Sequence, residues 1–206
     1  MITSKIHTPL RQLYIRHQRT RAFQSSERDG NAWMLGMYVL CAILMLFLLL
    51  INKLKMEEIV ETVEDGLTTS ALGGLVWDYR ATAISHDYIV DDEDECYRSV
   101  CELLGDNLNI SPTTINTYEG NDFISGTSKV TRIILYNVYS DSTIISYDYQ
   151  YLSDGTYTKV KGSMNTTPQG EGITETSIYI EYEFPIRICG FTKEVKKGEY
   201  VAIEKE

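Results

Sequence analysis

Residues 32–51 read AWMLGMYVLCAILMLFLLLI, a run of twenty residues without a charge. An α-helix of about 20 residues, at ~1.5 Å per residue, crosses a hydrocarbon layer ~30 Å thick. A helix buried in a globular core would normally be shorter or carry a polar stripe. The apolar part of a cleaved signal peptide is also shorter, and no pair of small residues suited to cleavage follows Ile51. We therefore expect a retained transmembrane helix over residues 32–52.

The charges on the two sides of this run differ. Residues 1–31 carry six Lys and Arg residues against Glu27 and Asp29, whereas the long segment after the run is acidic. Basic flanks stay in the cytoplasm. We therefore expect a single-pass plasma-membrane protein with a cytoplasmic tail at residues 1–31 and an extracytoplasmic domain at residues 53–206. An Arg-rich start is also found in mitochondrial presequences, but the apolar run that follows favours the anchor.

The helical period continues beyond the apolar run. No proline occurs between Ala32 and Asp78, and acidic residues lie mostly opposite an apolar stripe. The stripe recurs every four residues and consists of Ile59, Val63, Leu67, Ala71 and Leu75. This period predicts one helix of about 45 residues, with its first half in lipid and its amphipathic half on the domain. Gly66, Gly73 and Gly74 disfavour helix and predict either a bend or a point of close packing.

The second half of the chain changes to a period of two. Before it, the acidic run at residues 91–95 is suited to begin a short helix that ends near Leu108. Five later segments are rich in β-branched and aromatic residues and are separated by turn residues; they are 130–140, 143–152, 156–164, 178–188 and 191–203. The lysines of the third segment predict an edge strand. The fold class is therefore α+β, a long N-terminal helix packed on an antiparallel β-meander of four or five strands.

The cysteines leave two alternatives open. Cys41 lies in the apolar run and behaves there as a small apolar residue. Cys96, Cys101 and Cys189 fall in the domain, where an oxidising compartment would permit one disulfide among them. Cys96 and Cys101 lie on different faces of a regular helix, so a bridge between them needs the helix to end or bend. The other alternative is free buried thiols.

Groups that could carry catalysis are scarce in the domain. His86 is its single histidine, which excludes a multi-histidine zinc site and leaves one residue for any nucleophile–histidine pair. No nucleophile-elbow, P-loop or dinucleotide-binding glycine pattern occurs. The acidic run at 91–95 lacks the spacing of an EF-hand and is typical of a solvated helix start. We expect no enzymatic activity, no cofactor and no metal, and the acidic charge argues against a nucleic-acid partner.

Several segments, in their order along residues 28–203, carry a family resemblance. They are Arg28-Asp29-Gly30-Asn31 before the apolar run, then VEDGLTTSALGGLVWDY, YRSVCELLGDNLNI, SIYIEYEFPI and GEYVAI. Together they resemble TadE-type minor pilins of the bacterial tight-adherence pilus system, which is related to type IV pili. The resemblance implies a pilin-like fold, a leader-processing site at Gly30 and Asn31, and assembly into homo- or hetero-oligomers with other pilus or secretion-machine subunits.

One position departs from the pilin pattern. Pilin-type precursors carry a glutamate five residues beyond the cleaved glycine, and Leu35 stands there in this chain. An uncut membrane protein of the assembly platform therefore fits as well as a processed pilin. The alternative from another class is a single-span surface receptor or adhesin. Its tyrosine-rich β domain would bind a protein or glycan, although tyrosines are also ordinary strand residues.

Overall fold

The structure is a computed structural model of the 206-residue chain. It describes residues 8–75, 83–84, 87–121, 124–152, 156–188 and 190–203. For residues 8–30 and for residue 188 only the backbone path is described. The chain divides into two compact units, Met1–Lys53 and Leu54–Glu206.

The first unit consists of the N-terminal part of helix α1, whose full bounds are Thr8–Gly74. The helix begins well before the apolar run, so it includes most of the basic tail. Every residue from Asn31 to Ile51 is exposed, and no part of the most apolar stretch is buried. A core helix would be mostly buried, so this exposure favours a membrane span over a core helix. The helix that contains this segment is the one candidate membrane span within the described part of the chain.

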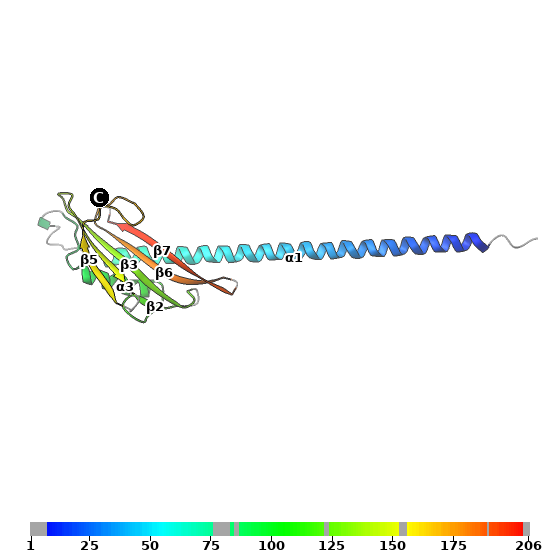
Figure 1. Ribbon diagram of the computed structural model, residues 1–206, viewed down its shortest axis with the longest axis horizontal. Coiled ribbons are helices and arrows are strands. Elements are labelled where there is room, and N and C mark those ends of the chain that lie inside the picture. The colour runs from blue at the N-terminus through cyan, green and yellow to red at the C-terminus, as the bar shows by residue number, and fades with distance from the viewer. Residues whose placement is uncertain are drawn as a thin grey trace, which may run out of the picture. The chain divides into compact units, whose positions relative to one another are not determined.

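The second unit contains the rest of α1, the short helix α3 and a sheet (Figure 1). Helix α3, Glu93–Asn107, begins in the acidic run, as predicted. The Asp92 carboxylate caps it by accepting a hydrogen bond from the Glu95 amide at 2.9 Å. Glu93, Asp94 and Glu95 occupy the first turn, where negative charge is favoured by the helix dipole.

The sheet has seven antiparallel strands. Their bounds are β1 Ser111–Pro112, β2 Thr117–Glu119, β3 Thr127–Val138, β4 Ile144–Tyr151, β5 Tyr157–Gly162, β6 Ser177–Ile188 and β7 Phe191–Ala202. The α+β class, with a long helix packed on an antiparallel sheet, is confirmed. The strand count and order differ from the expected meander, because β6 pairs with β3 instead of following β5.

The burial of the strands explains this order. Residues 133–138 of β3 are all buried, so the strand lies at the centre of the sheet and pairs along both of its edges, with β4 and with β6. Strand β5 is exposed along its whole length and carries Lys159 and Lys161, features that protect a sheet edge. The next strand is therefore placed on the other side of β3.

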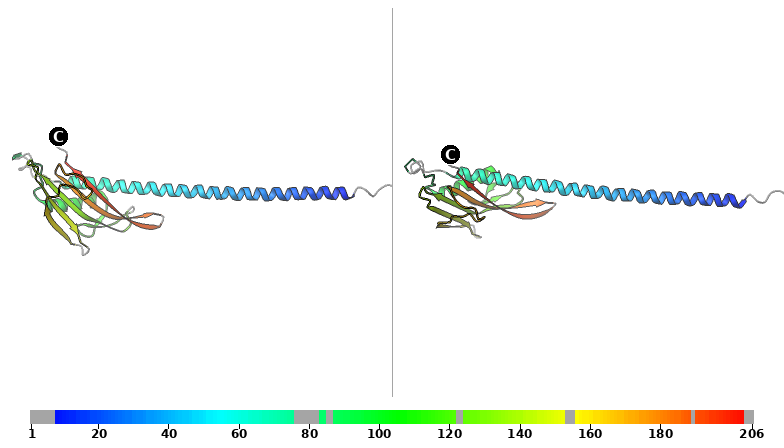
Figure 2. Two further views of the ribbon diagram at one scale, coloured as in Figure 1. Left: turned by 45° about the horizontal axis from the view of Figure 1, so that its top comes forward. Right: turned by 90° about the horizontal axis from the view of Figure 1, so that it is seen from above.

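The main core lies between the sheet and the two helices, which share one face of it (Figure 2). The predicted stripe of α1 enters this core: Val63, Leu67 and Ala71 are fully buried, Leu75 is nearly so, and Ile59 packs at its margin. The core-facing side chains of β6 share this cluster and are also fully buried: Ile178, Ile180, Tyr182 and Phe184. Burying each large apolar side chain contributes about 1.5–3 kcal/mol, so this packing fixes the amphipathic half of α1 to the sheet.

Candidate functional site

The contact between α1 and α3 depends on three glycines. A Cβ at Gly66 would lie 2.5 Å from Leu108 Cδ2, and one at Gly73 would lie 2.7 Å from Leu103 Cδ1. At Gly74 a Cβ would lie 3.2 Å from the Val100 amide nitrogen and 3.3 Å from the Cys96 carbonyl oxygen. The three glycines therefore mark a point of close packing between helices, the second of the two roles predicted for them.

A buried hydroxyl reinforces the same contact. Ser70 Oγ donates a hydrogen bond to the Gly66 carbonyl oxygen at 2.6 Å and accepts one from Asn107 Nδ2 at 2.9 Å. The sheet adds a third connection, because Lys197 of β7 forms an ion pair with Glu64 of α1. Helix α1 is therefore joined to the domain by glycine contacts, a hydrogen-bonded serine and a salt bridge.

The tyrosines on the helix-facing side of the sheet belong to the packing. Tyr149 is buried and stacks on Tyr97 with ring centroids 4.7 Å apart. Its hydroxyl donates to Asp94 Oδ1 at 2.6 Å, and Lys159 Nζ lies 3.0 Å from the same oxygen. The Tyr149 hydrogen bond, followed by Lys159, lowers the pKa of Asp94 below its usual value. These interactions tie the start of α3 to β4 and β5, so Tyr149 is not part of a free binding surface.

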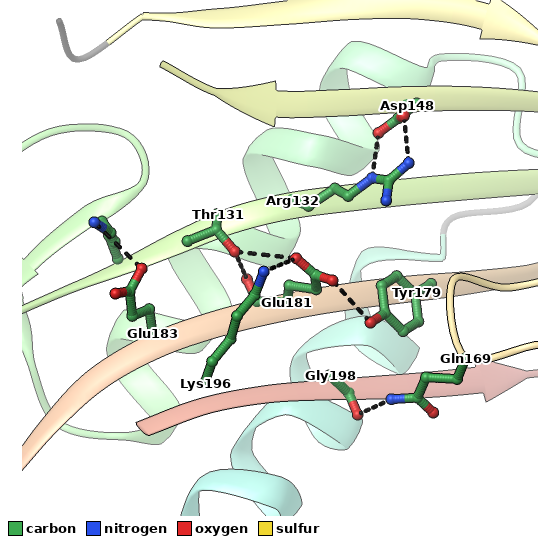
Figure 3. Close-up of polar contacts among 10 residues, drawn as sticks. Thr131, Arg132, Asp148, Gln169, Tyr179, Glu181, Glu183, Lys196 and Gly198 are labelled. Carbon is green, nitrogen blue, oxygen red and sulfur yellow. Dashed lines mark hydrogen bonds and ion pairs between the residues drawn. The ribbon is translucent and has the colours of Figure 1, made fainter. Parts of the chain in front are cut away.

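The opposite face of the sheet carries a network of charged and polar side chains (Figure 3). Arg132 of β3 donates to Asp148 of β4 through Nε at 2.9 Å and Nη2 at 2.7 Å. Glu181 of β6 accepts hydrogen bonds from Thr131 at 3.3 Å and Tyr179 at 3.0 Å, and it pairs with Lys196 of β7 at 2.7 Å. We call this set the outer-face network: Lys129, Thr131, Arg132, Asp148, Tyr179, Glu181, Glu183 and Lys196.

The outer-face network is internally paired rather than poised for acid–base chemistry. Asp148 is nearly buried, and its guanidinium partner holds both carboxylate oxygens. The network crosses four neighbouring strands, and cross-strand pairs of opposite charge stabilise a sheet. The sequence alone did not predict the outer-face network, because each of its charged residues, taken singly, is typical of a solvent-facing strand position. The available signal was the alternation of opposite charges on strands that pair.

A groove of about 380 Å³ lies beside α3 and the short strands β1 and β2. Its lining includes Arg98, Glu102 and Asp106 on the helix and Ile115 and Tyr118 opposite them. The size suits a small ligand, but the lining mixes both charges with apolar surface and brings no nucleophile–base pair together.

The predicted processing residues and cysteines are placed as follows. Gly30 and Asn31 are helical residues of α1, and Asn31 is exposed. Cys96 and Cys101 are free and buried, and burial raises the pKa of each thiol to about 12. At neutral pH both are therefore protonated and poorly reactive. Cys189 and His86 lie outside the described residues, and within those residues no cluster of three metal-binding side chains occurs.

Comparison of the chain with known protein families, curated proteins and solved structures gives no match. The structure therefore defines this chain by its architecture and not by a family. One candidate membrane helix leads into an α+β domain, which is the arrangement of a single-pass membrane protein.

Proposed function

We propose that this chain is a non-enzymatic structural subunit of a bacterial pilus or secretion assembly, of the minor-pilin or pseudopilin type. The observation that carries the proposal is that the two halves of α1 differ in burial. Residues 32–51 expose an uninterrupted apolar surface, while Val63, Leu67 and Ala71 of the same helix are buried in the domain. The order of sequence elements that resembles TadE-type minor pilins supports the same conclusion.

The physical logic of such a subunit follows from the two halves of the helix. In the bilayer, lipid covers the apolar half, and the positive charge before it keeps the N-terminus in the cytoplasm. In an assembly, neighbouring helices would cover the same surface, and small or apolar side chains there would pack closely.

The leader is part of the proposal. Leu35 stands where the pilin pattern has glutamate, so we propose that the working protein keeps residues 1–30 as a cytoplasmic tail. N-terminal sequencing of the protein from its host membrane should start before Asn31. A chain that starts at Asn31 would contradict retention and would favour a processed pilin.

A second candidate, a single-span receptor or adhesin, is favoured by one observation. The groove beside α3 is large enough for a small ligand or a peptide side chain. In that case the contacts that matter would lie at Arg98 and Glu102, on α3, and not on α1.

Site-specific photo-crosslinking in the native host separates the two candidates. A crosslinker replaces Glu61, which is exposed on α1, or Glu102, which lines the groove. A structural subunit should crosslink from Glu61 to copies of itself, to other single-span subunits or to a polytopic platform protein. Crosslinks from Glu102 alone, with normal pilus or secretion output after deletion of the gene, would reject the structural role and support the receptor.

Orientation has its own test. In a chain whose native cysteines are replaced by serine or alanine, Ser163→Cys lies at an exposed site of the domain and Ser4→Cys lies in the tail. A membrane-impermeant thiol reagent applied to intact cells should label Ser163→Cys and not Ser4→Cys. The reverse pattern would place the domain in the cytoplasm and exclude a surface assembly.

A further inference from the structure

The hairpin formed by β6 and β7 carries an uncovered aromatic side chain at its end. Strand β6 pairs with β3 only as far as Glu183, whereas it pairs with β7 to its last residue. Beyond Glu183 the two strands continue as a two-stranded ribbon, which extends past the rest of the sheet (Figures 1 and 2). Phe191, the first residue of β7, is 80% exposed, and no other aromatic side chain among the described residues of the domain is as exposed.

The alternation of β7 sets which charge lies beside the Phe191 ring. Phe191 and Lys193 share the face of β7 on which Val195 packs against the main core, because alternate residues of a strand point the same way. Lys193 is exposed and forms no ion pair within the described part of the chain. Glu194 lies on the other face, so the charge beside the ring is positive. We call Phe191 and Lys193 the hairpin tip.

The groove beside α3 carries the complementary features. Ile115 contributes an apolar side chain to its lining and is 37% exposed. Glu102 and Asp106 line it from α3, and their spacing of four residues places both on one side of the helix. Both are exposed, and neither forms an ion pair among the described residues. Arg98, the third charged residue of the lining, pairs with Glu95 at 2.9 Å, so the unpaired charge of the groove is negative.

The hairpin tip and the groove also agree in size. An apolar cavity of about 150 Å³ admits a benzene ring, so a groove of about 380 Å³ has room for the Phe191 ring. Lys193 follows Phe191 by two strand residues, or about 7 Å along β7. Glu102 and Asp106 are about 6 Å apart along α3. With the ring in the groove, a carboxylate of α3 is therefore within reach of the Lys193 ammonium group.

The two surfaces lie apart within one copy of the chain. Both belong to the unit Leu54–Glu206, but neither residue of the hairpin tip is part of the groove lining. A contact between them therefore joins two copies. Because the two surfaces differ, such a contact is heterologous, and each further copy adds in the same direction to give a ring or an open row.

We propose that the hairpin tip of one copy binds in the groove beside α3 of a second copy, with the Phe191 ring against Ile115 and Lys193 paired with Glu102 or Asp106. The contact rests on the assembly role proposed above, because one side-chain anchor is far smaller than the ~1,200 Å² that stable interfaces bury. It forms where other contacts already hold the copies close together. It gives the structural subunit a directional contact between neighbouring domains.

Photo-crosslinking in the native host tests this contact on the full chain. In one tagged copy p-benzoylphenylalanine replaces Phe191, and in the matched control it replaces Val160 on the exposed edge strand β5. A second copy carries a different tag. The crosslinker at position 191 should join the two copies, with mass spectrometry placing the attachment within residues 98–118, and the control should not give this product. Attachment elsewhere on the second copy, or only to other proteins, would overturn the proposal.

Charge reversal tests the ion pair in the same system. Lys193→Glu in the crosslinker copy should reduce the product at least about three-fold, since it brings like charges together. Glu102→Lys with Asp106→Lys in the second copy should restore the product. The three positions are exposed, so the variants should keep the fold. An unchanged yield with Lys193→Glu, or no restoration by the two reversals, would overturn the match between tip and groove.

The contact and the assembly role can fail separately. If a crosslinker at Glu61 joins the chain to other subunits while one at Phe191 reaches no groove, the contact is rejected and the structural role stands. If the Phe191 product forms but deletion of the gene leaves pilus and secretion output normal, the copies associate through this contact and the assembly role is rejected. If neither position crosslinks to another subunit, both are rejected.

Discussion

Gly74 at the end of α1 lies against the backbone of Val100 in α3, so close that a Cβ at position 74 would be 3.2 Å from the Val100 amide nitrogen. Few real Cβ contacts are that short, and a backbone atom cannot move aside as a side chain does. The two helices can therefore approach this closely only because residue 74 has no side chain.

We predict that Gly74→Ala lowers the stability of the domain. Alanine favours helix over glycine by up to about 1 kcal/mol, but overpacking a tight contact costs about 1–3 kcal/mol, so the clash should prevail. Thermal unfolding of the detergent-solubilised chain measures the change. Gly172→Ala is the control, because a Cβ there meets nothing within 4 Å. A Gly74→Ala chain that melts at or above the parent temperature would contradict the close approach.

A second prediction concerns the stripe on α1. Leu67 of α1 is fully buried in the core that this helix forms with the sheet. Leu67→Ala should reduce the free energy of unfolding by about 2–5 kcal/mol through lost burial and the cavity left behind. Leu67→Asp should cost more, because it would also place a charge in the core. Glu61→Gln, on the exposed side of the helix, should change stability by less than about 0.5 kcal/mol. If the Leu67→Asp chain and the parent melt together, α1 does not pack on the sheet.

The features that were predictable from the sequence are those set by local periods. Val63, Leu67 and Ala71 repeat every four residues, and Asp91–Glu95 begin a helix, because both signals act within one or two turns. The helix extends N-terminally to Thr8 because adding residues to an existing helix avoids the cost of nucleation. The tail's composition alone could not show this.

The features that were not predictable join distant parts of the chain. Strand β6 pairs with β3 across about fifty residues, and Lys197 meets Glu64 across 133 residues. No local period encodes either choice. The outer-face network follows from strand pairing: Arg132 and Asp148 face each other only once β3 and β4 are in register, and Thr131 meets Glu181 only once β6 pairs with β3. The groove beside α3 likewise depends on where β1 and β2 fold back.

A third prediction tests the anchor. Leu44 lies near the middle of the apolar run and is exposed. Leu44→Arg would place a charge near mid-bilayer, at a cost of roughly 2.5–3.5 kcal/mol on insertion scales. The membrane-bound fraction, measured after carbonate extraction, should fall. Leu44→Phe keeps the segment apolar and should remain in the membrane. If Leu44→Arg leaves the membrane fraction unchanged, this span is not the sole attachment.

The last prediction concerns alkaline pH and the buried hydroxyl of Tyr136, which has no hydrogen-bond partner among the described residues. Burial raises its pKa from the ordinary 10.0 to about 12. The folded state therefore binds this proton more tightly than the unfolded state does. The contribution to stability is complete below pH 10 and is lost as the pH rises toward 12. The same direction holds for Tyr182, whose pKa burial also raises to about 12.

The two tyrosines make a matched pair. Tyr136→Phe removes no hydrogen bond, so at neutral pH it should be neutral or slightly stabilising. Tyr182→Phe removes a hydrogen bond to Ser128 Oγ of 2.6 Å and should cost about 0.5–1.5 kcal/mol at neutral pH. Both variants should lose stability less steeply than the parent between pH 10 and pH 12. Chemical denaturation at several pH values, with tyrosinate absorbance recorded in parallel, measures both effects. If Tyr136→Phe were as destabilising at neutral pH as Tyr182→Phe, the Tyr136 hydroxyl would have to be hydrogen-bonded, and its packing beside Ile134 and Tyr179 in a second, smaller group of buried residues would need revision.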